Sequence, residues 1–534
     1  MAGRSRTSSR RFRRLVTAFL VVVAAIVAAL RWLLRRVPRD SSSGISWPRG
    51  QALPRFATPS RLDLLDLSGA LEPDALLAIT AQGVVNRNRP RVWLLRDADE
   101  GKRTWLDTVA LPGTPVTGAE ELVTSYRKEI RGAVLADAAV PATRNVATTL
   151  AGLENAVVAE PAVAERLGLP IVADLRGRFT DDRAASRWAV DELWPRTTHR
   201  MLVGLAPDNV GFLRDYAVAN QAFVIWANPG DANDRALLER LMADMPNNSP
   251  YLGWWPADVA GESEGTELAS RHGLYVVASD FSLNLTVLGG IRATGRVVRS
   301  APAPPLEDRT YVTFTMTDGD NIQYCQHRMR QIWDTPQRGL APLNWTISPL
   351  LRDAAPPILA YYQDTATPND LLVAGPSGAG YAYPTPWPDG TFPAFTRQTG
   401  RYVRAIGLPA VNVLNRVARH DRDLDAGEVA AYARDVAPAG ILQHWTNRYA
   451  VTIVSGLPVA TGRLVANVAE GRRVLAEAVA RPGRPGPRFV SIGTLAWSMT
   501  PADVATMTAE LDDRYRVVLA DQFFQLVRQS GAVV

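Results

Sequence analysis

Short apolar runs recur along the chain, and their spacing divides it into two halves. In the first half, five such runs have the length and β-branched content of buried strands: residues 133–135, 171–173, 201–205, 222–226 and 275–278. Amphipathic helical segments lie between some of them, as over 236–245, where Leu237, Leu238 and Leu241 share one face. This alternation predicts an N-terminal α/β domain over residues 57–299.

The second half carries eight strand candidates, at residues 311–317, 343–348, 371–374, 410–414, 440–443, 451–454, 489–493 and 515–519. Helices are predicted at 428–436, 464–479 and 502–511, the last behind Thr500-Pro501, which is typical of a helix start. Strands that alternate with helices predict a (β/α)-barrel-like C-terminal domain over 309–534. The gap between 443 and 451 is too short for a helix, so we do not expect a regular eightfold barrel. A Pro-rich linker at 300–308 separates the two domains.

One longer apolar run, residues 15–34, follows a basic tail. At about 1.5 Å per residue it would form a helix of about 30 Å, enough to cross the hydrocarbon core of a bilayer. Six arginines precede the run, which favours a cytoplasmic N-terminus. We therefore expect a cytoplasmic tail (1–14), a transmembrane anchor in the cytoplasmic membrane (15–34), a flexible spacer (35–56) and an extracytoplasmic body. Secretion after cleavage of a signal peptide is the alternative.

The net charge of +6 comes from this N-terminal region. Residues 1–39 hold ten arginines and no acidic residue, so the remainder has 49 basic against 53 acidic residues. A body with a net charge of about −4 has no electrostatic reason to bind nucleic acid. The sequence also lacks a glycine-rich phosphate loop, which argues against a nucleotide site. Cys325 is the only cysteine, so intrachain disulfides and Cys-rich metal centres are excluded, and we expect it to be a small buried apolar side chain.

An acidic turn, Asp318-Gly319-Asp320-Asn321, follows the strand predicted at 311–317. Ligand sites of barrels and open parallel sheets gather at the carboxyl ends of strands. If the turn is near-extended, both aspartates point the same way with Cα atoms about 6–7 Å apart. Such a pair could cleave a glycosidic bond as acid and base, or with one member as nucleophile. It could also bind a divalent cation, or simply cap a turn.

Asp370 precedes the strand predicted at 371–374. It is a candidate third catalytic carboxylate, or a turn residue at a strand entry. An EF-hand that began at Asp318 would need glutamate at its twelfth position, where Met329 stands, so no metal site of that type is expected.

A loop rich in glycine and tyrosine follows, and it suggests a carbohydrate substrate. Gly378 and Gly380 permit unusual backbone turns, and Tyr381, Tyr383 and Trp387 offer flat apolar faces with polar edges that suit pyranose rings. We expect these three aromatic side chains to form an exposed platform, with core packing as the alternative, and Asn321 to position a substrate hydroxyl.

Residues 378–384 read G-x-G-Y-x-Y-P, and with 82–87, 317–321 and 366–370 they resemble the GxGYxYP family of glycoside hydrolases. The resemblance spans residue 57 to the C-terminus. It implies a hydrolase that cleaves glycosidic bonds of a polysaccharide without a cofactor, unless a divalent cation binds Asp318 and Asp320. One alternative is a non-catalytic glycan-binding or envelope-scaffold protein that uses the same loop. Another is a metal-dependent enzyme acting on glycans or other esters.

Overall fold

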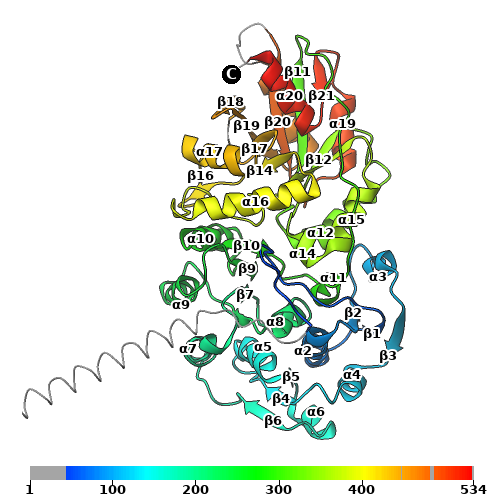
Figure 1. The fold of residues 1–534 in the computed structure, drawn as a ribbon, viewed down its shortest axis with the longest axis vertical. Helices are drawn as coiled ribbons and strands as arrows, with labels where there is room; N and C mark the ends of the chain where they lie inside the picture. Colours follow the sequence, from blue (N-terminus) through cyan, green and yellow to red (C-terminus); the bar gives the residue numbers. More distant parts are fainter. Residues whose placement is uncertain (1–43, 447, 481–485, 532–534) are drawn as a thin grey trace, which may run out of the picture. The chain divides into compact units, whose positions relative to one another are not determined.

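The computed structural model describes residues 44–446, 448–480 and 486–531 (Figure 1). The chain separates into two units, residues 1–40 and 41–534. The predicted tail and anchor lie outside the described residues. Within the described part, no helix is long and apolar enough to cross a membrane.

Three small parallel sheets form the N-terminal half of the described chain (Figure 1). The first has the order β2-β1-β3, with β1 Leu62–Asp66, β2 Val92–Leu95 and β3 Gly113–Val116. The second has the order β5-β4-β6, with β4 Gly132–Leu135, β5 Ala156–Val158 and β6 Ile171–Asp174. The third has the order β10-β9-β7-β8, with β7 Leu202–Gly204, β8 Phe223–Ile225, β9 Pro250–Gly253 and β10 Tyr275–Ala278.

Helices connect and cover these sheets, as expected for parallel strands. They are α2 Glu72–Asn88, α3 Thr104–Val109, α4 Ala119–Ser125, α5 Thr143–Glu154, α6 Pro161–Arg166, α7 Asp182–Glu192, the 3₁₀ helix Trp194–Arg196, α8 Arg214–Asn220, α9 Ala232–Ala243, α10 Asp258–Arg271 and α11 Leu285–Leu288. The predicted α/β pattern of this half is therefore confirmed, although β1, β2, β3, β5 and β9 were not among the predicted strands.

Within the described residues, seven parallel strands of the C-terminal half close into a barrel. In barrel order they are β11 Thr310–Met316, β12 Leu343–Ile347, β13 Asp370–Ala374, β14 Ala410–Asn412, β17 Gly440–Gln443, β19 Leu457–Val465 and β20 Arg488–Thr494. The surrounding helices are α12 Ile322–Gln326, α13 Arg328–Trp333, α14 Leu351–Ala354, α15 Pro356–Thr365, α16 Phe392–Ile406, α17 Ala426–Asp435, α18 Val468–Ala480, α19 Pro501–Ala509 and α20 Ala520–Ser530. A short hairpin, β15 Arg416–Val417 and β16 His420–Asp421, follows β14.

Two irregularities explain why the barrel is not eightfold. β18 (Ala450–Val454) runs antiparallel to β19, so a hairpin occupies the place of a crossover helix, in agreement with the short gap after residue 443. β21 (Tyr515–Val517) pairs with the start of β11, whereas β12 pairs only with its end, at Thr315 and Met316. β20 pairs with the other edge of β11 along its whole length. β21, which would be the eighth strand, therefore lies between β11 and β12 at the amino end of the barrel.

The barrel joins the third sheet through the loop after β13. Tyr381 forms an antiparallel bridge with Val276 of β10, with backbone N–H···O distances of 2.7 and 2.8 Å. Tyr381 and Tyr383 pack into the same apolar core as side chains of the three N-terminal sheets. The motif loop is therefore an additional edge of the third sheet as well as part of the barrel domain.

The expected spacer is shorter than predicted. Ile45, Leu53 and Phe56 are buried, and Ser46 pairs with Arg55 in an isolated bridge. Apolar side chains in this segment pack on the body, so the prediction of a flexible spacer is wrong over residues 45–56. Similarly, α18 begins at Val468 instead of residue 464, because β19 extends to Val465.

Candidate active site

The acidic turn lies at the carboxyl end of β11, as predicted. Its backbone is not extended, because Asp318 adopts a left-handed φ of 73°. Gly319 packs so closely on β12 that a Cβ atom would lie 2.0 Å from the carbonyl carbon of Thr346, and its N–H donates to the Thr346 hydroxyl at 2.9 Å. On the other side, Gly375 leaves no room for a side chain beside the backbone nitrogen of Asp320. The two carboxyl groups therefore project from a tightly held turn.

A third carboxyl group comes from the N-terminal half, and the sequence analysis did not identify it. Glu262 on α10 is partly buried, and its Oε1 accepts a 2.7 Å hydrogen bond from the Tyr381 hydroxyl. A guanidinium nitrogen of Arg416 lies 3.8 Å from the same oxygen. The Tyr383 hydroxyl lies 3.1 Å from that of Tyr381. Tyr381 thus holds one carboxylate oxygen of Glu262, and Glu262 interacts electrostatically with Asp318 and Asp320 of the acidic turn.

The three carboxyl groups interact electrostatically, and their pKa values rise. Burial raises the pKa of Asp320 well above its usual range, and the charges of Asp318 and Glu262 raise it further. Asp320 is only 8% exposed. Burial also raises the pKa of Glu262, although the Tyr381 hydroxyl and Arg416 counteract part of this effect. Like charges at close range favour retention of a proton in the group, and Asp320 is the member best placed to keep it.

Asp318 has a different environment. Burial raises the pKa of its carboxyl group, but hydrogen bonds from Thr317, from Trp497 and from the backbone N–H of Ala496 oppose that rise. The Thr317 hydroxyl lies 2.6 Å from Oδ2. Donors of this kind stabilise the ionised form. The two aspartates therefore differ. The carboxylate of Asp318 accepts hydrogen bonds, whereas the pKa of Asp320 is set mainly by burial and by neighbouring negative charge.

Trp497 lies in the loop after β20 and contacts both the turn and solvent. It donates a hydrogen bond to Asp318, and its ring packs edge-on against Tyr324 with centroids 5.6 Å apart. Even so, the side chain is 51% exposed. A large apolar face that stays open beside carboxyl groups is suited to stacking against a pyranose ring.

The prediction that three aromatic side chains of the motif loop form an exposed platform is wrong. Tyr381, Tyr383 and Trp387 are 2%, 0% and 2% exposed, so none offers an open face. Trp387 packs against Phe395 with ring centroids 5.0 Å apart, in the apolar core. The alternative of core packing therefore holds for all three side chains.

The glycines of the motif loop allow the loop to pack closely against its neighbours. Gly378 and Gly380 have φ values of 141° and 119°, which other residues rarely adopt. A Cβ atom at Gly380 would lie 2.2 Å from the ring of Tyr275 on β10, and one at Gly378 would lie 2.5 Å from Thr399. These glycines permit close packing of the loop, and the described contacts do not place them at an open surface.

Asp370 lies at the opposite end of the barrel from the acidic turn. It is the first residue of β13 and pairs in register with Leu343, the first residue of β12, at the amino ends of both strands. Its buried carboxylate accepts from Arg338 at 2.5 Å and from the Trp345 indole at 2.9 Å. The structure thus does not bring Asp370 to Asp318 and Asp320, and its role is that of a paired buried charge.

Asn321 is the N-cap of α12. Its Oδ1 accepts the backbone N–H of Tyr324 at 2.9 Å, so the oxygen expected to hold a substrate hydroxyl is already engaged. Cys325 is fully buried, and burial raises the pKa of its thiol to about 12, which confirms the prediction of a small buried apolar side chain.

Among the described residues, no group of three or more His, Cys, Asp or Glu side chains is arranged to hold a metal ion.

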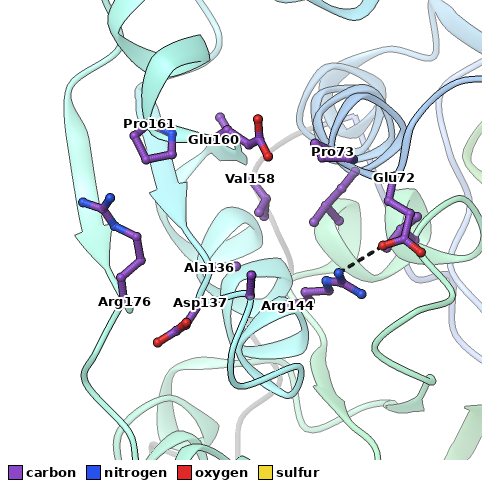
Figure 2. Close-up of a pocket in the computed structure, with 13 residues that line it drawn as sticks. Glu72, Pro73, Ala136, Asp137, Arg144, Val158, Glu160, Pro161 and Arg176 are labelled. Carbon is purple, nitrogen blue, oxygen red and sulfur yellow. Dashed lines mark ion pairs between the residues drawn. The ribbon is translucent and has the colours of Figure 1, made fainter.

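A cavity of about 420 Å³ lies elsewhere, at the carboxyl ends of β4 and β5 (Figure 2). Arg144 and Glu72 line it and form an ion pair at 3.0 Å, which the dashed line in Figure 2 marks. Arg176, also in its lining, pairs with Asp174 at 2.7 Å. None of the predicted site residues lines this cavity, and its arginines are neutralised.

Comparisons with known proteins agree with this architecture. A crystal structure described as that of a putative hydrolase from Bacteroides thetaiotaomicron VPI-5482 superposes with a TM-score of 0.79. It is 22% identical, and the match covers 91% of this chain and 99% of that one, so the two share a fold. The glycosyltransferase SnogD from Streptomyces nogalater also matches, at 11% identity over 89% of this chain and 96% of that one, but with a TM-score of 0.14. A search of curated proteins gives no match.

Three family models match consecutive parts of the chain. "GxGYxYP_N second domain" matches residues 130–197, and "GxGYxYP third domain" matches residues 199–290. "GxGYxYP putative glycoside hydrolase C-terminal domain" matches residues 308–528. Together these matches cover nearly all of residues 130–528, and the chain therefore belongs to the GxGYxYP family.

Proposed function

We propose that this protein is a glycoside hydrolase that cleaves a polysaccharide outside the cytoplasmic membrane, with Asp318 and Asp320 as its catalytic pair. The observation that carries the proposal is the grouping of two dissimilar aspartates with Glu262 beside the exposed face of Trp497. The family description is consistent with this chemistry. The location rests on the apolar run of residues 15–34, and secretion after signal cleavage is the alternative.

Asp320 is the general acid of the proposed mechanism. Burial and two neighbouring negative charges raise its pKa, which favours the protonated form that an acid needs. It donates that proton to the glycosidic oxygen as the bond between this oxygen and the anomeric carbon breaks. The leaving sugar departs as an alcohol, and Asp320 becomes a carboxylate.

Asp318 is the ionised partner. Its three hydrogen-bond donors stabilise the carboxylate, which either removes a proton from the attacking water or attacks the anomeric carbon itself. Glu262 does not act on the sugar in this scheme. Its negative charge helps to keep Asp320 protonated, and the Tyr381 hydroxyl fixes its position. Trp497 is the platform on which the sugar ring stacks.

The test is hydrolysis of a broad panel of polysaccharides and cell-wall glycans by the full chain, with released reducing ends as the readout. Asp320→Asn and Asp318→Asn should each lower the rate by about a hundredfold or more, because removal of an acid or base typically costs that much. Asp370→Asn is the matched control, since Asp370 is a buried carboxylate of the same barrel and lies away from the turn. Its rate per folded molecule should stay near that of the parent protein.

Two results would replace the proposal. Glycan binding without release of reducing ends, lost in Trp497→Ala, would make the protein a glycan-binding or scaffold protein. Activity that a chelator abolishes and Mg²⁺ or Ca²⁺ restores would make Asp318 and Asp320 cation ligands instead of an acid–base pair.

A further inference from the structure

Four arginines line one polar pocket of about 380 Å³, and no residue of the acidic turn belongs to its lining. They are Arg49, Arg55, Arg292 and Arg352, and they come from three separate segments of the chain. Outside the first 39 residues, the chain carries more acidic than basic residues. Four guanidinium groups around one pocket are therefore a local concentration of positive charge on a body that is net negative.

In the part of the chain that the structure describes, none of these arginines forms an ion pair with a carboxylate. Arg352 acts electrostatically on the adjacent Asp353, which also lines the pocket. Arg292 donates only to backbone carbonyls, including that of Phe56 at 3.0 Å. Partial burial lowers the pKa of Arg292, and the positive charge of Arg55 lowers it further. By contrast, Arg144 and Arg176 in the cavity of Figure 2 are both paired with carboxylates.

The one carboxylate in the lining is engaged elsewhere. Asp353 is buried, and its Oδ2 accepts the backbone N–H groups of Ala52 and Leu53 at 3.1 and 3.2 Å. The same oxygen accepts from the Tyr402 hydroxyl. Asp353 therefore attaches the segment that bears Arg49 and Arg55 to α14, which bears Arg352. All four arginines are exposed, and these contacts hold the backbone segments that carry three of them around one pocket.

We propose that this pocket binds a phosphate group carried by a ligand. Guanidinium groups bind phosphate oxygens through paired N–H donors, and their weak hydration makes them suited to this role. A phosphate dianion can accept from several arginines at once, whereas one carboxylate would leave most of the four charges unneutralised. The ligand is either a soluble phosphorylated molecule or the headgroup of a phospholipid, and both present the same chemistry to the pocket.

The first experiment measures binding of inorganic phosphate and pyrophosphate to the full chain by titration calorimetry and by the shift in Tm. The double variant Arg55→Gln/Arg292→Gln should bind at least about tenfold more weakly, because it loses two charged donors. Its Tm without ligand is measured as well, because Arg292→Gln removes a repulsion from Arg55 but also the hydrogen bonds to the carbonyls of Gly289 and Phe56. Arg187→Gln/Arg473→Gln is the matched control, which removes two exposed arginines from α7 and α18.

Phosphate also stabilises proteins through exclusion from their surface, so ionic strength is kept constant and the three proteins are compared. A Tm rise that is equal in parent, double variant and control, with no heat of binding, would overturn the proposal. Vesicles of phosphatidylglycerol and of phosphatidylcholine then identify the source of the phosphate. Greater sedimentation of parent than of double variant with phosphatidylglycerol indicates a headgroup. Equal sedimentation, with phosphate binding that depends on Arg55 and Arg292, indicates a soluble ligand.

Discussion

At the scale of single residues, Trp497 combines two properties that a substitution can separate. Its exposed face is available for stacking, and its indole N–H donates to Asp318. Trp497→Phe keeps an aromatic face and removes the donor, whereas Trp497→Ala removes both. Loss of a stacking contact costs about 0.5–1.5 kcal/mol, so we expect Trp497→Ala to raise KM by up to about tenfold.

Trp497→Phe should leave KM within a few fold of the parent value and change mainly the pH dependence, because Asp318 loses a stabilising donor and its pKa rises. Steady-state kinetics of the two variants provide the measurement. If both substitutions raise KM equally, the face of Trp497 is not the sugar platform.

The pKa of Asp320 leads to a prediction about the direction of pH dependence. In the mechanism that we propose, Asp320 must be protonated to act as general acid, so kcat/KM should fall as pH rises through its raised pKa. Glu262→Gln removes one of the negative charges that raise this pKa. The pKa of Asp320 then decreases, and the alkaline limb of the pH profile moves to lower pH.

Glu264→Gln on the same helix is the control, because Glu264 pairs with Arg419 instead of facing the turn. Its pH profile should match that of the parent. An alkaline limb that stays in place in Glu262→Gln would show that Glu262 does not set the protonation of Asp320.

At the scale of secondary-structure elements, the loop that carries the family motif joins β10 to the barrel. Gly380 is the tightest point, because a Cβ atom there would meet the ring of Tyr275 and the φ of 119° is unfavourable for other residues. We expect Gly380→Ala to destabilise the protein by about 2 kcal/mol or more, the range for overpacking combined with backbone strain. The variant should also have lower activity, although it keeps all three carboxyl groups, because the position of Glu262 depends on Tyr381.

Gly390→Ala is the matched control, because a Cβ atom at Gly390 meets nothing within 4 Å. Chemical denaturation and the hydrolysis assay measure the two effects. Normal stability in Gly380→Ala would contradict the role of the motif as a joint.

Several of the strands that the sequence predicted are continuous apolar runs. β10, and β13 after Asp370, are buried on both faces and were found from such runs. The buried strand β2 has the same character and was nevertheless not predicted. β1 was missed because aspartates interrupt it, and β19 because it contains Pro458, Gly462 and Arg463. The hairpin after residue 443 was predictable from loop length alone.

The candidate site was predictable only in part. The strand-end rule located Asp318 and Asp320, since it needs only a strand and the turn behind it. The same rule cannot distinguish the start of a strand from its end unless it is known which end of the strands carries the site. It therefore also proposed Asp370. Glu262 was missed because its electrostatic interaction with the turn joins segments far apart in sequence, and its helix also carries Glu264 and Glu267, which resemble it.

At the scale of the whole described body, the domains share their cores. One apolar cluster contains Leu64, Tyr275 and Trp345, from the first sheet, the third sheet and the barrel. A second cluster contains Tyr381 and Tyr383 together with side chains of all three N-terminal sheets. Separate domains of one chain normally bury only modest, polar interfaces, so shared cores of this kind are typical of parts that unfold together.

We therefore expect the third sheet and the barrel to unfold in one cooperative transition, although family models divide them at residues 290 and 308. The candidate site depends on this coupling, because Glu262 and the acidic turn belong to different sides of the division. Calorimetry should give one transition for both parts, and hydrogen exchange should show the amides of β10 and β14 losing protection at the same denaturant concentration. Gly380→Ala should lower both midpoints together. A variant in which β14 keeps the midpoint of the parent while β10 exchanges early would mean that the barrel is stable alone and that the third sheet docks on it reversibly, so that Glu262 joins the site only part of the time.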